Sequence, residues 1–448
     1  MRARAAVVGL LLWSGSAGAA ALPEAAPERH LGVKACSGAP CHGRGAANGA
    51  VVLQDEHSTW MRRDAHSRAY LSLVDERGKR IARKLGIAEP ERDKRCLDCH
   101  ADNVPDDQRS RGEQFSLEDG VGCEACHGGS GGRSADPSDG WIRTHFAEQL
   151  DHARNVQRGM YPTDAPVARA TLCLSCHLGT RDKFVDHRMM AAGHPRMSFE
   201  LDTFTQVQPA HFRVDDDYRE RGKAVPSSAA LWAVGQAVQV RSFLEELAEP
   251  KHGPHGIWPE FVFFDCNACH HPMRDARWAP RATAGLAAGP GMPRLNDSSL
   301  LMLRAVLAAV DPAAAARLRQ QTLATHAATL QGTTELVAAS RQLREAVDEA
   351  ITSLASWSPT PETVRAAASN LIAEALAGEY RDYAAAEQVT MAVQSLSSAL
   401  DELGALDQPR LDRINRTIET LLAATRDGEA FDPASLAPSL RQLQAELR

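Results

Sequence analysis

The sequence predicts a mainly α-helical protein in two parts of different character, an irregular part rich in cysteine and histidine followed by a helical bundle. All ten cysteines and sixteen of the seventeen histidines lie within residues 30–271, where long periodic segments are scarce. Residues 297–448 contain no cysteine and are rich in Ala, Leu and Gln. Their apolar residues recur every three to four positions, which is the period of a helix face.

Residues 1–21 have the pattern of a cleaved secretory signal peptide. Two arginines precede the apolar run Ala5–Trp13, and small residues with A-x-A cleavage sites follow up to Ala21. That run is too short to cross a bilayer, and Gln236 and Arg304 interrupt the later apolar stretches, so no membrane span is expected. The net charge of −7 argues against nucleic acid as a partner. We therefore expect an exported protein of the periplasm or beyond.

Five copies of one cysteine–histidine motif lie in residues 22–285 and account for every cysteine. Four copies have the form C-x-x-C-H, and the first has four residues between its cysteines. The two cysteines of such a motif can form thioethers with one haem, and the histidine that follows can bind its iron. The sequence therefore predicts five covalently bound haem c groups. The motifs are Cys36/Cys41/His42, Cys96/Cys99/His100, Cys123/Cys126/His127, Cys173/Cys176/His177 and Cys266/Cys269/His270.

Zinc sites and disulfides are the alternative interpretations of these cysteines. A zinc site needs four ligands, and neither a zinc site nor a disulfide requires a histidine directly after every second cysteine. Five such histidines, with no cysteine left over, favour haem attachment. The longer spacer between Cys36 and Cys41 would require the attachment geometry of the first site to stretch.

The second axial ligand of each iron decides what the haem can do, because a motif supplies only the first. A second histidine leaves an electron carrier, whereas an open position lets a substrate bind. Eleven histidines remain for five positions. Met189 or Met190 could replace one imidazole, and His271 could ligate a neighbouring haem or bond a propionate. The predicted distal ligands are His66, His145, His187, His194 and His211, with His57, His152, His252 and His255 as reserves.

Helices are expected in both parts of the chain. In the first part the better candidates are residues 71–85 and 229–247, and residues 131–140 have the composition of a loop. A Pro- and Gly-rich linker at residues 286–296 separates this part from residues 297–448, where five to seven helices and no strand are expected. Asp311-Pro312, Thr360-Pro361 and Asp432-Pro433 each place a capping residue before a helix-starting proline. The single histidine of the bundle, His326, is expected to be a partly buried or surface residue.

Several segments resemble a lineage of multihaem c-type cytochromes that includes pentahaem nitrite reductases, hydroxylamine oxidoreductase and its tetrahaem electron-acceptor cytochrome. The segments are W-M-R-R-D-A-H-S-R-A-Y, G-V-G-C-E-A-C-H-G, M-A-A-G-H-P-R with F-E-L after it, and W-P-E-F through D-C-N-A-C-H-H. The resemblance covers about residues 30–280. It implies stacked pairs of haems wrapped in short helices and loops, with the motif of Cys123 as the central site. It also implies that the five predicted distal histidines bind iron.

The sequence departs from the enzymes of this lineage. It has no C-x-x-C-K motif, which the nitrite reductases use at their catalytic haem, and it lacks the extra cross-link and high haem count of hydroxylamine oxidoreductase. We therefore predict a pentahaem cytochrome that carries electrons between redox partner proteins, its irons held mostly by two histidines.

The sequence leaves two other functions open. One is a haem enzyme with a single open iron that acts on a small nitrogen or sulfur compound, with His57, His152, Arg154, Tyr161 and Arg188 as candidate donors around it. The other is an electron-outlet subunit that its C-terminal helices dock onto a larger complex. These helices could also form a homodimer.

Overall fold

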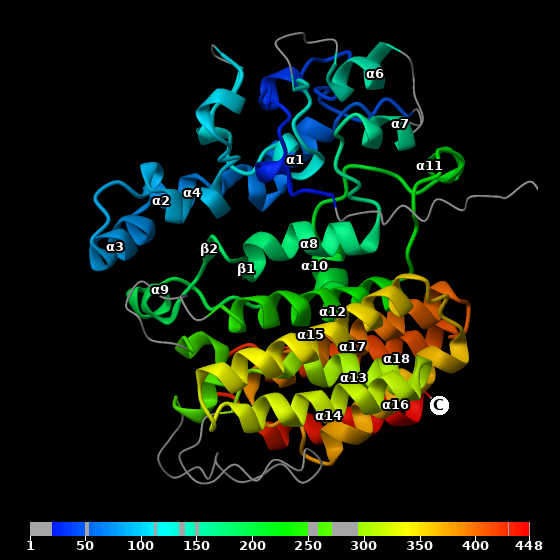
Figure 1. The fold of residues 1–448 in the computed structure, drawn as a ribbon. Coiled ribbons are helices and arrows are strands. Elements are labelled where there is room, and N and C mark those ends of the chain that lie inside the picture. Colours follow the sequence, from blue (N-terminus) through cyan, green and yellow to red (C-terminus); the bar gives the residue numbers. More distant parts are fainter. Residues whose placement is uncertain are drawn as a thin grey trace, which may run out of the picture.

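The computed structural model describes residues 20–49, 53–111, 114–133, 139–147, 152–249, 259–270, 294–428 and 430–447. The predicted signal peptide lies almost wholly outside these residues, as do His252, His255, His271 and most of the predicted linker. The described chain is mainly α-helical, as predicted, and its one sheet is a two-stranded hairpin (Figure 1). None of the described helices is long and apolar enough to cross a membrane.

Short helices and loops make up the cysteine-rich part, and two longer helices lie beneath them (Figure 1). Strands β1, Gly179–Thr180, and β2, Lys183–Phe184, pair antiparallel. The helices are α1 Glu56–Arg63, α2 Leu71–Val74, α3 Glu76–Leu85, α4 Lys94–His100, α5 Cys123–His127, α6 Trp141–Ala147, α7 His152–Gln157, α8 Pro166–His177, α9 His187–Ala192, α10 Leu201–Val207, α11 Asp216–Glu220 and α12 Ser228–Leu247.

The two helix predictions for this part have different outcomes. The segment expected to be helical at 229–247 is α12, and the side chain of Ser227 caps it by accepting from the backbone N–H of Ala230. The segment 71–85 is divided into α2 and α3 rather than forming one helix. The division falls at Asp75, whose carboxylate accepts from the backbone N–H of Gly78 at 2.7 Å and so starts a new helix.

Seven α-helices form the bundle within residues 294–428 and 430–447, at the upper end of the predicted number. Asp311 and Thr360 cap α14 and α16, as predicted. Asp432 also caps, but Pro433 begins a 3₁₀ turn, Pro433–Leu436, that leads into the last helix. The helices are α13 Ser298–Val310, α14 Pro312–Ala328, α15 Thr333–Ala355, α16 Pro361–Leu376, α17 Tyr383–Glu402, α18 Gln408–Ala424 and α19 Ala437–Glu446.

The main apolar core belongs to the bundle and continues into α8 and α12. Helix α12 is buried on nearly all sides and packs against α8, α13, α15 and α17. Its Trp232 is fully buried, and the amide of Gln236 donates to the side-chain oxygen of Gln388 on α17 at 2.8 Å. A helix that is apolar around most of its circumference is stable only inside a protein. The core therefore contains residues from both sides of the predicted linker, since α8 and α12 precede the linker in the chain and the bundle helices follow it.

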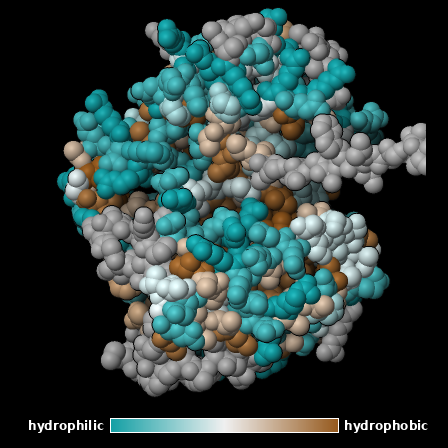
Figure 2. All heavy atoms as spheres, in the orientation of Figure 1, coloured by the Kyte–Doolittle hydropathy of each residue, from teal (hydrophilic) through white to brown (hydrophobic). Residues whose placement is uncertain are grey.

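The cysteine-rich part has little apolar core of its own. Its separate buried cluster contains only Leu73, Leu97 and Ala101, with a few partly buried neighbours. Hydrophilic side chains cover most of its visible face (Figure 2). So small a cluster cannot organise a segment of this length by apolar packing alone.

Candidate haem-binding sites

Each of the five motif histidines lies beside one of the five predicted distal histidines. When two imidazoles bind one metal ion from opposite sides, each metal–nitrogen bond is about 2 Å long. Adding the distance from each nitrogen to its ring centre places the two ring centroids about 6 Å apart. Each pair therefore has the separation that an iron between two imidazoles requires. Numbered by motif, the centroid distances are 6.0 Å for His42–His145 (site 1), 6.4 Å for His100–His194 (site 2), 6.2 Å for His127–His211 (site 3), 6.1 Å for His177–His66 (site 4) and 6.1 Å for His270–His187 (site 5).

The described reserve histidines have other neighbours. The ring of His57 lies beside Trp60, at 5.8 Å between centroids. Nε2 of His152 is hydrogen-bonded to the carboxylate of Asp164 at 2.7 Å. Contrary to the expectation of a partly buried or surface residue, the bundle histidine His326 is buried, because its Nε2 bonds to the buried carboxylate of Asp297 at 3.2 Å, which fits a structural role.

Hydrogen bonds at Nδ1 hold four of the paired imidazoles. A ring fixed through Nδ1 directs Nε2 outward as a metal ligand, and such partners normally orient metal-binding histidines. Local sequence could have revealed the Asp64 and Pro195 partners, but the others come from distant residues. The acceptors are Glu56 Oε2 for His42 (2.9 Å), Asp64 Oδ1 for His66 (2.9 Å), Ala69 O and Ser72 Oγ for His100 (3.0 and 2.9 Å) and Pro195 O for His194 (2.9 Å).

The protonation states of two motif histidines suit metal binding, whereas hydrogen bonds to Glu56 and Asp64 raise the pKa of His42 and of His66. Burial, helped by neighbouring histidines, lowers the pKa of His127 to about 3 and that of His177 to about 4. Both imidazoles are therefore neutral at neutral pH, which is the form that coordinates a metal. Burial opposes ionisation of Asp64, but hydrogen bonds from His66 and Gln208 outweigh it and hold the pKa of this carboxyl well below its ordinary value.

The ten cysteines, all of which the structure describes, are free and form no disulfide. Thiols of different motifs touch one another: Cys36 contacts Cys123, and Cys99 contacts Cys176. Sites 1 and 3 are therefore neighbours, and so are sites 2 and 4. Cys126 of site 3 also lies near Cys173 and Cys176 of site 4, so the sites form a connected series, and the stacked pairs that the resemblance implies stay a prediction.

The fifth motif differs from the other four in its exposure to solvent. Cys266 and Cys269 are exposed, whereas the eight other cysteines are partly buried. The physical reason is local: motifs two to four lie on α4, α5 and α8, but the fifth occupies a single 3₁₀ turn, Cys266–Ala268, that ends at Cys269. Within the described residues a haem at site 5 would be more open to solvent than the others. Attachment at this motif, as at the other four, stays a prediction; here it rests on the motif and on the pairing of His270 with His187.

The first motif, despite its longer spacer, has a backbone hydrogen bond that is also present in the fifth motif. In the fifth motif the backbone N–H of His270 donates to the carbonyl of Cys266 at 2.7 Å. In the first motif the N–H of His42 donates to the carbonyl of Cys36 at 3.2 Å, although two more residues lie between them. A turn closed by the Cys41 N–H and the Gly38 carbonyl, 2.8 Å apart, accommodates the additional residues. The longer spacer is thus compatible with the same local geometry.

Glu124, inside the third motif, is a structural residue that the sequence did not single out. Its buried carboxylate accepts from the backbone N–H groups of Leu31 at 3.0 Å and Gly32 at 2.6 Å, and from both the N–H and the hydroxyl of Ser130. It thereby ties the segment that enters site 1 to the helix of site 3. Its position between two cysteines carries no sequence signal for this role.

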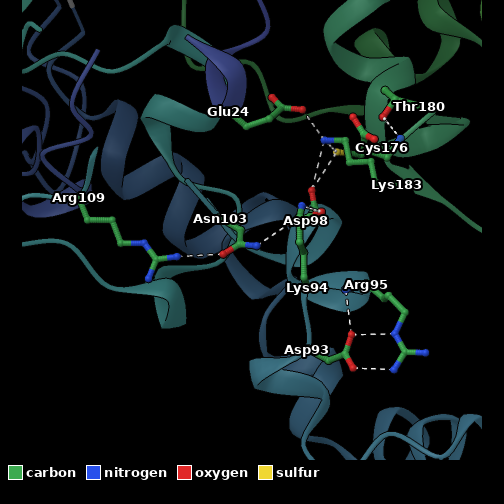
Figure 3. Close-up of polar contacts among 11 residues, drawn as sticks. Glu24, Asp93, Lys94, Arg95, Asp98, Asn103, Arg109, Cys176, Thr180 and Lys183 are labelled. Carbon is green, nitrogen blue, oxygen red and sulfur yellow. Dashed lines mark hydrogen bonds and ion pairs between the residues drawn. The ribbon is translucent and has the colours of Figure 1, made fainter. Parts of the chain in front are cut away.

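Lys183 joins the segments around sites 2 and 4 (Figure 3). Its buried ammonium donates to Glu24 at 2.7 Å and to the carbonyl of Asp98 at 3.3 Å, and it lies 3.3 Å from the sulfur of Cys176. These contacts connect the hairpin to α4 and α8. A charged group this well buried is stable only because it has such partners.

The bundle supports two of the sites through α17. The ring of Phe199 stacks on His177, with centroids 4.7 Å apart, and the side-chain amide of Gln388 donates to the Phe199 carbonyl at 3.0 Å. At site 5, the side-chain oxygen of Asn267 accepts from the backbone N–H of Tyr383 at 3.1 Å. The helical bundle is therefore part of the framework that positions these motifs.

Paired histidines at repeated attachment motifs on a helical framework are the features of a c-type cytochrome. Residues 35–128, which include the first three motifs, match the family described as cytochrome c554 and c-prime. This match confirms the resemblance to multihaem c-type cytochromes and supports a role in electron transfer with covalently bound haem c as cofactor. No curated protein and no solved structure matches the chain.

Proposed function

We propose that the protein is an exported pentahaem c-type cytochrome that carries electrons between redox partner proteins. The observation that carries this proposal is the presence of a second histidine about 6 Å from every motif histidine. In each site the two motif cysteines would hold one haem, which supplies reversible one-electron chemistry when bound. The two histidines of the site would fill both axial positions of its iron.

The same pairing favours a carrier over an enzyme. An enzyme of this class needs one iron with an open position, and here a histidine stands opposite each motif histidine. Two residues considered as donors to such a site have structural partners instead. Tyr161 donates its hydroxyl to the carbonyl of Ala168 at 2.9 Å, and His152 is bonded to Asp164.

The spacing at site 1 supports counting five haems rather than four. His42 lies opposite His145 at the same separation as the histidines of the C-x-x-C-H sites, despite the longer spacer. Export rests on the signal-peptide pattern of residues 1–21 and on the thioether chemistry, which takes place outside the cytoplasm. Docking or dimerisation through the bundle stays a prediction.

Low-temperature EPR of the purified oxidised protein, combined with its intact mass, tests the proposal. We expect the mass of five haems and only low-spin signals. His66→Ala should convert one haem to a high-spin, ligand-accessible form, whereas the matched reserve variant His57→Ala should leave all signals low-spin. A high-spin haem in the unmodified protein would contradict the carrier function. A haem count below five would contradict the proposed loading.

A further inference from the structure

Helix α3 carries an unusual concentration of positive charge for a chain of net charge −7. Its ten residues contain one acidic and five basic side chains, and all five basic ones are exposed or partly exposed. The acidic residue, Glu76, lies in the first turn. The basic residues are Arg77, Lys79, Arg80, Arg83 and Lys84.

In the described part of the chain none of these five basic side chains forms an ion pair with an acidic side chain. Arg77 donates to the neutral carbonyl of Gly193 at 3.1 Å. The basic residues of the following segment differ, because Arg92 pairs with Glu89, Lys94 with Asp98 and Arg95 with Asp93. The excess positive charge is therefore concentrated on α3, which we call the cationic face.

The helix that carries the cationic face lies next to site 2. Just before α3, the carbonyl of Ala69 and the hydroxyl of Ser72 accept from Nδ1 of His100. Helix α3 itself packs against α9, whose C-terminal end leads through Gly193 into His194, the other histidine of the site (Figure 1). The chain that carries the cationic face thus contacts both sides of this one site. A protein bound there would lie close to the site 2 cofactor.

The composition of α3 favours a protein partner over a membrane. A helix that inserts into a membrane surface needs an exposed apolar face as well as a basic one. In α3 the apolar side is already used, because Ala82 is buried and Ile81 and Leu85 are partly covered. What remains exposed is charge, which attracts an acidic surface and accelerates its encounter.

We infer that the cationic face of α3 is the docking surface for an acidic redox partner protein, which it holds against site 2. This inference rests on the proposed function, because site 2 must contain a haem for such docking to have a purpose. Electrostatic docking of this kind weakens as salt is added.

The test uses an acidic plant-type ferredoxin as the probe and calorimetric binding as the readout. The test variant is Lys79→Glu with Arg80→Glu, in which attraction of the new carboxylates to Arg83 and Lys84 one turn later offsets their repulsion by Glu76 one turn earlier, so the helix is retained. The control is Arg416→Glu with Arg441→Glu, which changes the net charge equally at exposed positions of the bundle. A milder variant, Lys79→Gln with Arg80→Gln, guards against misfolding.

We expect the affinity of the α3 variant to fall about tenfold or more at low salt, and that of the bundle variant to change less than about twofold. Equal losses in both variants, or no loss in either, would overturn the inference. So would α3-dependent binding to phosphatidylserine vesicles together with ferredoxin binding that does not depend on α3. The haem mass of each sample tests the proposed function separately, because the binding measurement needs no electron transfer.

Discussion

Replacing Glu56 with glutamine should raise the reduction potential of site 1 selectively. Nδ1 of the motif histidine His42 donates to Oε2 of Glu56 at 2.9 Å. A negatively charged acceptor makes the imidazole a stronger electron donor, which stabilises oxidised iron and lowers the potential. Glutamine keeps the size and an oxygen acceptor but removes the charge, so this stabilisation is lost.

The magnitude follows from the strengths of the two hydrogen bonds. A bond to a charged group contributes about 1.5–3 kcal/mol and a neutral one about 0.5–1.5 kcal/mol, so the exchange weakens the bond by roughly 1 kcal/mol. The Glu56 side chain is only 17% exposed, so solvent screens little of this difference. For one electron, ~1.4 kcal/mol corresponds to about 59 mV. We therefore expect an upward shift of about 40 mV.

The assay is a potentiometric titration followed by optical spectra and EPR. The signal of site 1 is identified as the one that disappears in His145→Ala. The control is Glu89→Gln, which removes an equal charge from an exposed side chain paired with Arg92. A site 1 potential that stays constant or falls would refute the reasoning, and so would an equal shift in the control.

Three further predictions concern loading, stability and pH. Replacing Cys36 and Cys41 by serine should lower the intact mass by one haem and leave the other four attached. Leu343→Ala, in the fully buried part of α15, should lower the free energy of unfolding in urea by about 2–5 kcal/mol, whereas the exposed Leu330→Ala should have little effect. Burial, and then the neighbouring Glu200, raise the pKa of Asp202 to about 7. The folded state therefore holds this proton more tightly than the unfolded chain, so the resulting stability is present in acid and lost between about pH 4 and 7. Urea titrations across this range should show a smaller loss for Asp202→Asn, and an equal loss in both proteins would contradict the prediction.

The sequence alone determined the features that depend on short stretches of chain. Each attachment motif needs only five to seven consecutive residues, so its chemistry is legible without a fold. The caps at Asp311 and Thr360 are local in the same way. The five distal candidates were also recoverable, because histidines are concentrated in one part of the chain and several lie in segments that resemble known cytochromes.

Only the tertiary structure decided which residues meet. His66 is nearer in the sequence to His42 and His100 than to His177, yet its ring faces His177. The exposure of Cys269, in a motif otherwise identical in spacing to its neighbours, is equally invisible in the sequence. The core that α12 shares with the bundle also arises from tertiary packing and cannot be seen in the sequence. These features depend on how distant segments of the chain pack together. The sequence therefore identifies the candidate ligands but not the distances between them.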